Sequence, residues 1–389
     1  MTAWRGPPRI GVGDVVAAYL PNSIEAVVAH PACARVGATL TSCSPDLEAG
    51  AGDRPVRTAL PPALIIAADG YTFARRPRDR RAAVAEPAGA IDGLRGIVLV
   101  PRLGLDGLDR LATERWADLC ARPAPLELEQ VPFDHPLCVL FSSGTAGAPK
   151  GIVHGHGGQP LDRVRYHALH RPEPPEDRSF WYTTTSWMIW NWLLAGLLVG
   201  STIVVYDGSP RHPSLAAQFA LAEAAGVTVL GNSASYLTGC AKSGFAPGRE
   251  RELGRLRTVA STVPPLPPAT FEWLHDAVGI WTVSASGGTD ICSAFVSAPR
   301  CVRLDVPRRR ATRRLGRAAR RWSARSSGGP TRRSTVTASA SARRRSMRRS
   351  TSSRGSRTAW SSASSSPTAA TGCRCSSRSS PGPAWTTTS

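Results

Sequence analysis

Residues 141–151 form the run F-S-S-G-T-A-G-A-P-K-G, whose side chains suit the binding of phosphate groups. Glycines let the backbone approach a ligand closely, hydroxyls and exposed N–H groups donate hydrogen bonds, and Lys150 adds a positive charge. The run differs from the G-x-x-x-x-G-K-[ST] loop because Pro149 precedes the lysine and Gly151 follows it. A solvated serine- and glycine-rich turn is the alternative, but the length and order of the run favour a phosphate site.

Four further segments accompany this loop, at 182–192, 231–237, 261–266 and 286–291. The loop resembles the phosphate-binding loop of the adenylate-forming acyl-CoA synthetases, whose usual form is [ST]-[SG]-G-T-T-G-x-P-K-G. The motifs T-T-T-x-W-M-x-W-N-W, Y-D-G-S-P and S-G-G-T-D-I narrow the resemblance to the acetoacetate–CoA ligases. It extends from about residue 10 to about residue 298 and is weakest at 48–62.

The resemblance implies an acid–thiol ligase of fatty acid metabolism that uses ATP, Mg²⁺ and coenzyme A. Acetoacetate would attack the α-phosphorus of ATP to form an acyl-adenylate, and the thiol of coenzyme A would then displace AMP. The family's phosphate-contacting positions correspond to Ser142, Ser143, Gly144, Thr145, Gly147 and Lys150. Thr289 would contact the α-phosphate, Asp290 would hold Mg²⁺, and Lys150, Thr289 and Asp290 are the expected catalytic residues. The adenine turn corresponds to Val263, Pro264 and Pro265, and the acyl pocket to Trp187, Met188 and Gly287.

Several of these residues also fit ordinary structural roles. Trp187 and Met188 suit an apolar core, and the Thr289–Asp290 pair suits a turn or a helix cap. His154 and His156 suggest metal ligands, but they lie beside glycines, with no carboxylate or cysteine at matching spacing. A structural role is therefore favoured for both histidines.

Three positions bear on specificity and on nucleotide binding. Acetyl-CoA synthetases carry a tryptophan near the Gly287 position, so a glycine there is expected to leave room for a longer acyl group. If that hypothesis holds, a Gly287→Trp variant should lose its preference for acetoacetate over acetate. Ala146 replaces the family's second loop threonine, and Val263 stands where these ligases usually carry glycine. Both departures are expected to weaken ATP binding without altering the fold.

Alternating strand and helix segments throughout residues 10–298 predict an α/β fold with mostly parallel sheets flanked by helices. The resemblance implies that this fold is the large N-terminal domain of the adenylate-forming superfamily, in an incomplete form. Strands are predicted at 15–20, 39–41, 64–67, 97–100, 136–140 and 227–230, and helices after Ser23 and Ser214. The uncharged segment 187–206 is long enough to span a membrane, but its internal glycines favour a core helix at 187–198 and a buried strand at 202–206.

The net charge of +20 belongs wholly to the end of the chain. Residues 300–389 hold 22 arginines and a single acid, so the preceding 299 residues are close to neutral. Arg, Ser, Ala and Thr dominate this tail, which is short of the apolar side chains that a core requires. The expected organisation is a leader at 1–9, a partial AMP-binding domain at 10–298, and a disordered tail at 299–389.

No lysine follows Lys242, whereas the family places a catalytic lysine in a small C-terminal domain. We therefore expect residues after about 297 to be translated out of frame, with a shorter slip at 48–62 and impaired adenylation. The N-terminus lacks the apolar stretch of a signal peptide, and no C-x-x-C pair occurs, so a cytoplasmic setting is expected.

Three alternatives remain open at this stage. The chain could be another short- or medium-chain acyl-CoA ligase, because the loop motifs are shared and only the acyl pocket differs. A catalytically dead nucleotide-binding remnant is the second alternative. Nucleic-acid binding through the arginines of the tail is the third, and the absence of a recognition module disfavours it. Small-molecule substrates are the expected partners, with no membrane and no specific nucleic acid; the oligomeric state is left open.

Overall fold

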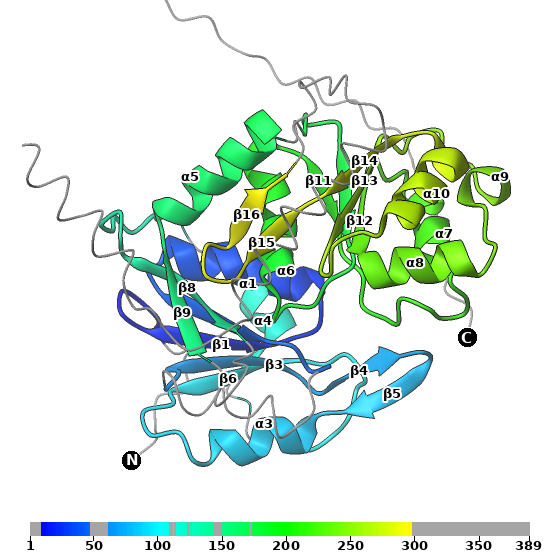
Figure 1. Ribbon diagram of the computed structural model, residues 1–389. Helices are drawn as coiled ribbons and strands as arrows, with labels where there is room; N and C mark the ends of the chain where they lie inside the picture. The colour runs from blue at the N-terminus through cyan, green and yellow to red at the C-terminus, as the bar shows by residue number, and fades with distance from the viewer. Residues whose placement is uncertain are drawn as a thin grey trace, which may run out of the picture. The chain divides into compact units, whose positions relative to one another are not determined.

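The described part of the chain is built from two mostly parallel sheets covered by helices (Figure 1). The computed structural model describes residues 9–46, 61–108, 112, 114–122, 125, 127–142, 150–170 and 173–297. The chain divides into two units, Met1–Gly328 and Gly329–Ser389, and all described residues belong to the first. Residues 1–8, 47–60 and 298–389 lie outside the described residues. These ranges contain most of the expected leader, most of the suspected slip at 48–62 and the whole of the expected tail.

The first sheet has seven strands in the order β7-β6-β3-β1-β2-β8-β9, and only β9 runs antiparallel to its neighbour. The strands are β1 (Val15–Tyr19), β2 (Thr39–Cys43), β3 (Leu64–Ala68), β6 (Gly96–Val100), β7 (Glu114–Arg115), β8 (Pro136–Ser142) and β9 (Lys150–Gly155). Residues of β1 alternate between two apolar clusters, because successive side chains of a strand point to opposite faces. One cluster contains residues of α1 (Ile24–Arg35), and the other contains Val84 of α3 (Arg81–Ala88). Helices therefore cover both faces, as parallel sheets require.

The second sheet has five parallel strands in the order β11-β10-β12-β13-β14. They are β10 (Arg178–Trp181), β11 (Thr202–Val204), β12 (Val229–Ser233), β13 (Thr258–Thr262) and β14 (Trp281–Ser284). Phe180, Leu230 and Val259 pack against α7 (Ala217–Ala224), α8 (Ala234–Lys242) and α10 (Pro268–Val278). Both sheets confirm the predicted α/β fold.

Helix α6 (Met188–Leu194) packs against both sheets at once. Trp190 and Leu194 join the cluster around β1 and α1, whereas Trp192 and Leu193 join Trp181 of the second sheet. This position explains the uncharged segment that begins at Trp187, because a helix buried on all sides is apolar on all sides. Within the described ranges, none of the helices combines the length and apolar character that a bilayer crossing requires.

Some predicted boundaries and burials were wrong. The helix expected at 187–198 is divided into α6 and the 3₁₀ helix η3 (Ala195–Val199). Strand β11 lies at an edge of its sheet and Thr202 is exposed, so the expected buried strand at 202–206 is shorter and only partly covered. Ser214 accepts a hydrogen bond from the backbone N–H of Ala216 at 3.2 Å and so caps a turn, and helix α7 begins only at Ala217.

The remaining elements complete the frame around the site. Two antiparallel hairpins are formed, one by β4 (Gly70–Phe73) with β5 (Arg76–Asp79) and one by β15 (Ser286–Gly288) with β16 (Ser293–Val296). The other helices are α4 (Trp116–Cys120), α5 (Gly158–Arg165), α9 (Pro247–Glu250) and the π-helical turn η2 (Tyr166–His170). In Figure 1 the β15–β16 hairpin lies between α5 and the five-stranded sheet.

Candidate active site

A pocket of about 490 Å³ opens at the carboxyl ends of strands from both sheets. These ends contribute Ser42 and Cys43 from β2, Phe141 and Ser142 from β8, Trp181 from β10, Asn232 and Ser233 from β12, and Thr262 from β13. Ligands of open α/β sheets bind outside the carboxyl ends of the strands, where connecting loops diverge and leave a crevice. The pocket is therefore the candidate site.

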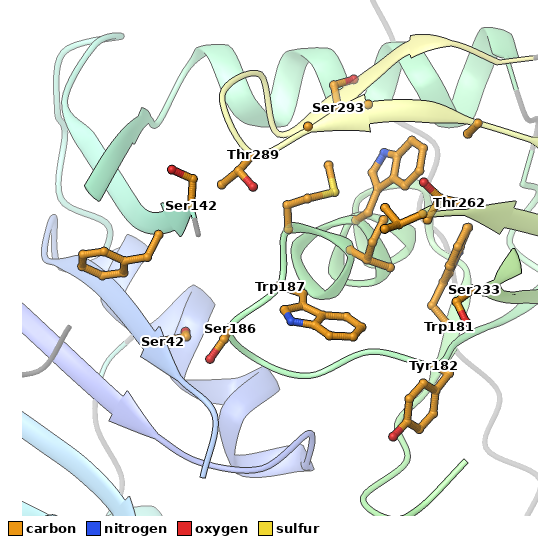
Figure 2. Close-up of a pocket in the computed structure, with 18 of the residues that line it drawn as sticks. Ser42, Ser142, Trp181, Tyr182, Ser186, Trp187, Ser233, Thr262, Thr289 and Ser293 are labelled. Carbon is orange, nitrogen blue, oxygen red and sulfur yellow. The ribbon is translucent and has the colours of Figure 1, made fainter. Parts of the chain in front are cut away.

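One end of the pocket holds two hydroxyl groups that the sequence assigned to phosphates, Ser142 and Thr289 (Figure 2). Ser142 is the last residue of β8 and pairs with Lys150, the exposed first residue of β9. The loop between them carries the expected contacts Ser143, Gly144, Thr145 and Gly147, which lie outside the described residues. The two flanks of that loop therefore have defined positions beside the pocket.

Thr289 begins a tight turn between β15 and β16. The backbone N–H of Cys292 donates to the carbonyl oxygen of Thr289 at 3.2 Å and closes the turn. Cys292 has a φ of +47°, a left-handed conformation that is uncommon outside glycine. Its buried thiol sulfur lies 3.2 Å from Nε2 of Gln159 and 3.6 Å from Nη2 of Arg163, both on α5. The turn is thereby anchored to α5, and Asp290 projects from it as an exposed carboxylate.

The opposite part of the pocket is largely aromatic and apolar. Trp187 is half-exposed and lies between Ser142 and Tyr182 in the view of Figure 2. Met188 follows it at the start of α6 and packs against the clusters of both sheets. The ring of Trp181 lies over Gly231, where an added Cβ would be 1.9 Å from the indole. Trp187 and Met188 both line this pocket, and Met188 packs against the core as well; that they contact an acyl group stays a prediction.

Gly287 and Gly288 both line the pocket, but their missing side chains would point in different directions. A Cβ at Gly287 would lie 2.0 Å from the carbonyl oxygen of Ser293 in the partner strand β16. A Cβ at Gly288 would meet nothing within 4 Å. The glycine at 287 is therefore required by the approach of β16, and a Gly287→Trp variant would displace this strand before it shortened the pocket.

The predicted adenine turn is only partly in the pocket. Val263 lines it with a 72% exposed side chain, whereas the exposed Pro264 and Pro265 are not among its lining residues. Val263 has a φ of +32°, which favours glycine because a Cβ crowds the backbone there. Backbone geometry thus agrees with the family's usual glycine at this position.

A chain of charged groups flanks the pocket on the side of Tyr182. Arg102 lies 3.1 Å from a carboxylate oxygen of Asp207 and 3.6 Å from one of Glu25. Burial raises the pKa of Asp207 from 3.8 to about 6, and this effect outweighs the opposing attraction of Arg102. Burial also raises the pKa of Tyr182, whose hydroxyl donates to the carbonyl of Gly208 at 3.3 Å. Tyr182 is therefore a neutral hydrogen-bonding group at neutral pH.

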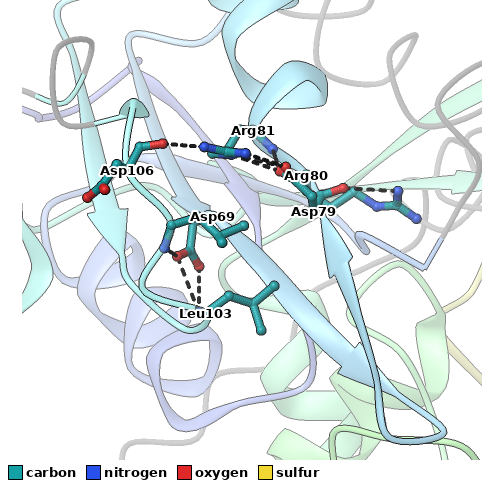
Figure 3. A network of polar contacts seen from close by, with 7 residues as sticks. Asp69, Asp79, Arg80, Arg81, Leu103 and Asp106 are labelled. Carbon is teal, nitrogen blue, oxygen red and sulfur yellow. Dashed lines mark hydrogen bonds and ion pairs between the residues drawn. The ribbon is translucent and has the colours of Figure 1, made fainter.

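A fully buried carboxylate, Asp69, holds the loop that contains Arg102. Figure 3 shows its contact with the neighbouring Leu103. Asp69 follows β3 and accepts backbone N–H bonds from Arg102 at 2.8 Å, Leu103 at 3.0 Å and Leu105 at 2.8 Å. These hydrogen bonds hold the loop after β6 in a single conformation. Nearby, the exposed Arg81 bonds Asp79 on β5 at 2.7 Å.

Sequence reasoning missed Ser42 and Cys43 as pocket residues. Ser42 and Cys43 end a strand that pairs with β8, so adjacency of parallel strand ends was the available signal. Ser186 accepts a hydrogen bond from the backbone N–H of Ser44 at 2.5 Å, and it thereby joins the loop before α6 to the end of β2. No local pattern identifies that contact.

The two histidines considered as metal ligands in the sequence, His154 and His156, contact backbone carbonyls. His154 lies 3.0 Å from the carbonyl oxygen of Thr289, and His156 lies 3.1 Å from that of His135 and 3.3 Å from that of Ala34. Among the described residues, no three His, Cys, Asp or Glu side chains gather in a way that could hold a metal ion.

Known proteins resemble this chain in sequence and in fold. The family described as "AMP-binding enzyme" matches residues 9–323, which is most of the chain. The chain belongs to the AMP-binding enzyme family. It is 41% identical over 298 residues to the acetoacetyl-coenzyme A synthetase of Rhizobium meliloti, covering 74% of this chain and 45% of that protein. It is 34% identical over 333 residues to the acetoacetyl-CoA synthetase of Danio rerio, covering 81% and 48%.

A solved structure is similar to this chain in both fold and sequence. The acetoacetyl-CoA synthetase from Streptomyces lividans superposes with a TM-score of 0.71 at 44% identity, covering 75% of this chain and 45% of that one. The chain thus spans less than half the length of the relatives it matches.

Proposed function

We propose that this chain belongs to an ATP-dependent acid–thiol ligase that converts acetoacetate to acetoacetyl-CoA through an acyl-adenylate. The observation that carries the proposal is that Ser142 and Thr289 line the same pocket as the apolar side chains of Trp187 and Met188. The named relatives at 34–44% identity support acetoacetate as the acid. We further propose that residues 10–298 form the AMP-binding domain and that the protein is cytoplasmic.

In this proposal the chain positions the reactants and stabilises developing charge. The Ser142 hydroxyl, the loop after it and Lys150 hold the β- and γ-phosphates. The Thr289 hydroxyl donates to an α-phosphate oxygen, which gains negative charge as the carboxylate of acetoacetate attacks the α-phosphorus and pyrophosphate leaves. Trp187 and Met188 surround the acyl group and exclude water from the reactive mixed anhydride. The coenzyme A thiol then attacks the acyl carbon and releases AMP.

Asp290 fits the role of a magnesium ligand. Its carboxylate is exposed on the turn directly after the pocket residue Thr289, although Asp290 is not itself among the residues that line the pocket. Mg²⁺ typically binds one or two protein carboxylates and takes its other ligands from phosphates and water. A lone carboxylate is therefore sufficient, and the ion when bound would neutralise phosphate charge.

The test is ATP–pyrophosphate exchange by the chain, dependent on added acid, with acetoacetate, acetate, propionate, butyrate and octanoate compared at equal concentrations. Exchange highest with acetoacetate supports the proposal, and exchange highest with another acid identifies a different acyl-CoA ligase. ATP binding without exchange identifies a nucleotide-binding remnant. A Thr289→Val variant, which keeps the side-chain shape and removes the hydroxyl, should lower exchange about 100- to 1000-fold.

A further inference from the structure

His154 connects the two sides of the proposed phosphate site. It is the fifth residue of β9. The first residue of this strand, Lys150, pairs with Ser142. Thr289 belongs to the turn between β15 and β16, 135 residues later in the chain. The contact between His154 and Thr289 is therefore a direct link between the strand that flanks the phosphate loop and the residue assigned to the α-phosphate.

The chemistry of the contact fixes its direction. Nε2 of His154 lies 3.0 Å from the carbonyl oxygen of Thr289, and a carbonyl only accepts, so the ring nitrogen carries the proton and donates. The same oxygen accepts the N–H of Cys292 at 3.2 Å. Both lone pairs are thus used, and the peptide plane that follows Thr289 is held in one orientation.

The state of the ring agrees with this role. His154 is half-buried, and burial is the main cause that lowers its pKa below the usual value, with a further lowering from Arg163. Its bond to Thr289 and the charge of Asp290 oppose that shift. The imidazole is therefore neutral at neutral pH, with its single proton on Nε2.

We propose that His154 is a positioning residue that holds the Thr289 hydroxyl toward the α-phosphate through the Thr289 carbonyl. The inference rests on the proposed function, because it assumes that Thr289 contacts the nucleotide. In this proposal His154 is more than a structural residue, because its substitution weakens the contact with one phosphate group of the nucleotide. Losing one hydrogen bond that orients such a contact corresponds to a loss of about tenfold in affinity.

His156 is a matched control on the same side of the sheet. It lies two residues further along, immediately after β9, and its ring also faces backbone carbonyls. Those carbonyls belong to His135 and Ala34, away from the Thr289 turn. A substitution at His156 therefore repeats the loss of a partly buried imidazole without touching Thr289.

The experiment compares the dissociation constants of AMP and adenosine, measured by titration calorimetry on the full chain. The two ligands differ only in the α-phosphate group, so their ratio isolates that contact. In His154→Phe the dissociation constant of AMP should rise about tenfold, while that of adenosine changes by less than about twofold. His154→Gln, whose amide N–H can reach the same carbonyl, should restore AMP binding to within about threefold of the original. His156→Phe should leave the ratio unchanged.

The outcomes separate the two proposals. An unchanged ratio in His154→Phe, or equal weakening of both ligands, overturns the positioning role and leaves the nucleotide site in place. If the unaltered chain binds neither ligand, the proposed nucleotide site itself is refuted, and the inference with it. Should the phenylalanine variant fail to melt cooperatively, His154→Asn replaces it, because the shorter amide does not reach the carbonyl.

A double variant adds an independent check. Thr289→Val removes the hydroxyl that His154 is argued to orient, so the effects of the two substitutions on AMP should not add. The double variant is expected to bind AMP about as weakly as Thr289→Val alone. Fully multiplied losses would show that the two residues act separately and would overturn the inference.

Discussion

Replacing Gly287 and Gly288 one at a time by alanine should have opposite effects on stability. The two glycines are neighbours in the chain and line the same pocket. A Cβ at 287 would lie 2.0 Å from the Ser293 carbonyl oxygen and 3.0 Å from Cα of Ala294, whereas a Cβ at 288 meets nothing within 4 Å. Gly287→Ala must therefore push β16 away, and Gly288→Ala fits the existing backbone.

The magnitude follows from the contact distances. Ordinary contact begins at 3.4 Å, so the Ser293 carbonyl must retreat by more than 1 Å to admit a methyl group at 287. Rearrangement of packed structure on that scale costs about 1–3 kcal/mol. Both variants gain about 0.4–1 kcal/mol because alanine has less freedom than glycine in the unfolded chain. This gain cancels in the comparison, so Gly288→Ala should be the more stable variant by about 1–3 kcal/mol.

The assay is thermal unfolding of both variants beside the original chain, followed by circular dichroism. Gly287→Ala should melt several degrees lower than Gly288→Ala, since about 1 kcal/mol corresponds to roughly 2–4 °C in a domain of this class. Equal melting temperatures, or a higher one for Gly287→Ala, would refute the account of β16. The result also decides where acyl specificity is tested, because only a side chain at 288 can narrow the pocket without moving the hairpin.

Three further predictions concern the frame of the pocket. Asp69→Asn should lower the free energy of unfolding in urea by about 2–4 kcal/mol, because backbone N–H groups lose a buried acceptor; the exposed Asp79→Asn is the control, and equal effects of the two would contradict the account. Asp207 has a pKa of about 6 in the folded protein against 3.8 for the free side chain, so its stabilising contribution is complete below about pH 4 and is lost as the pH rises through about 6. Asp207→Asn removes that dependence, so the stability of the variant relative to the original chain should rise between about pH 4 and pH 7, by at most roughly 3 kcal/mol. Melting temperatures of both chains across this pH range would measure the rise. A stability difference that does not change with pH would count against this account of Asp207. Val263→Gly should not lower the melting temperature, because glycine adopts the same positive φ without the roughly 1–2 kcal/mol of strain that a Cβ causes, whereas its flexibility in the unfolded chain costs roughly 0.5–1 kcal/mol. A fall of several degrees would show that Val263 is unstrained.

Local chemistry made much of this protein predictable from sequence. Buried parallel strands are continuous apolar runs, so β1, β2, β3, β6 and β8 were placed to within one or two residues. A phosphate loop needs glycines, hydroxyls and a lysine in one order, and that order needs no tertiary information. The same motifs singled out Ser142, Trp187, Met188, Gly287 and Thr289, which all line the pocket, and the binding roles of these residues stay predictions.

The ends of strands and helices were less predictable where the burial of a segment differs from what its amino-acid composition suggests. Thr202–Val204 is as apolar as a core strand, but it lies at the edge of its sheet and is only partly covered. The helix expected after Ser214 begins only at Ala217, because a serine hydroxyl caps a turn as readily as a helix.

Tertiary structure alone decided the contacts that join distant segments. The direction of the missing side chain at Gly287 depends on the approach of β16. Asp69 finds its donors 33 to 36 residues later, and His154 finds the Thr289 carbonyl 135 residues later. Sequence specifies which groups can donate, accept or carry charge, because those properties belong to single residues. Which donor meets which acceptor depends on how the two sheets pack around α6, and that arrangement arises only when the whole chain folds.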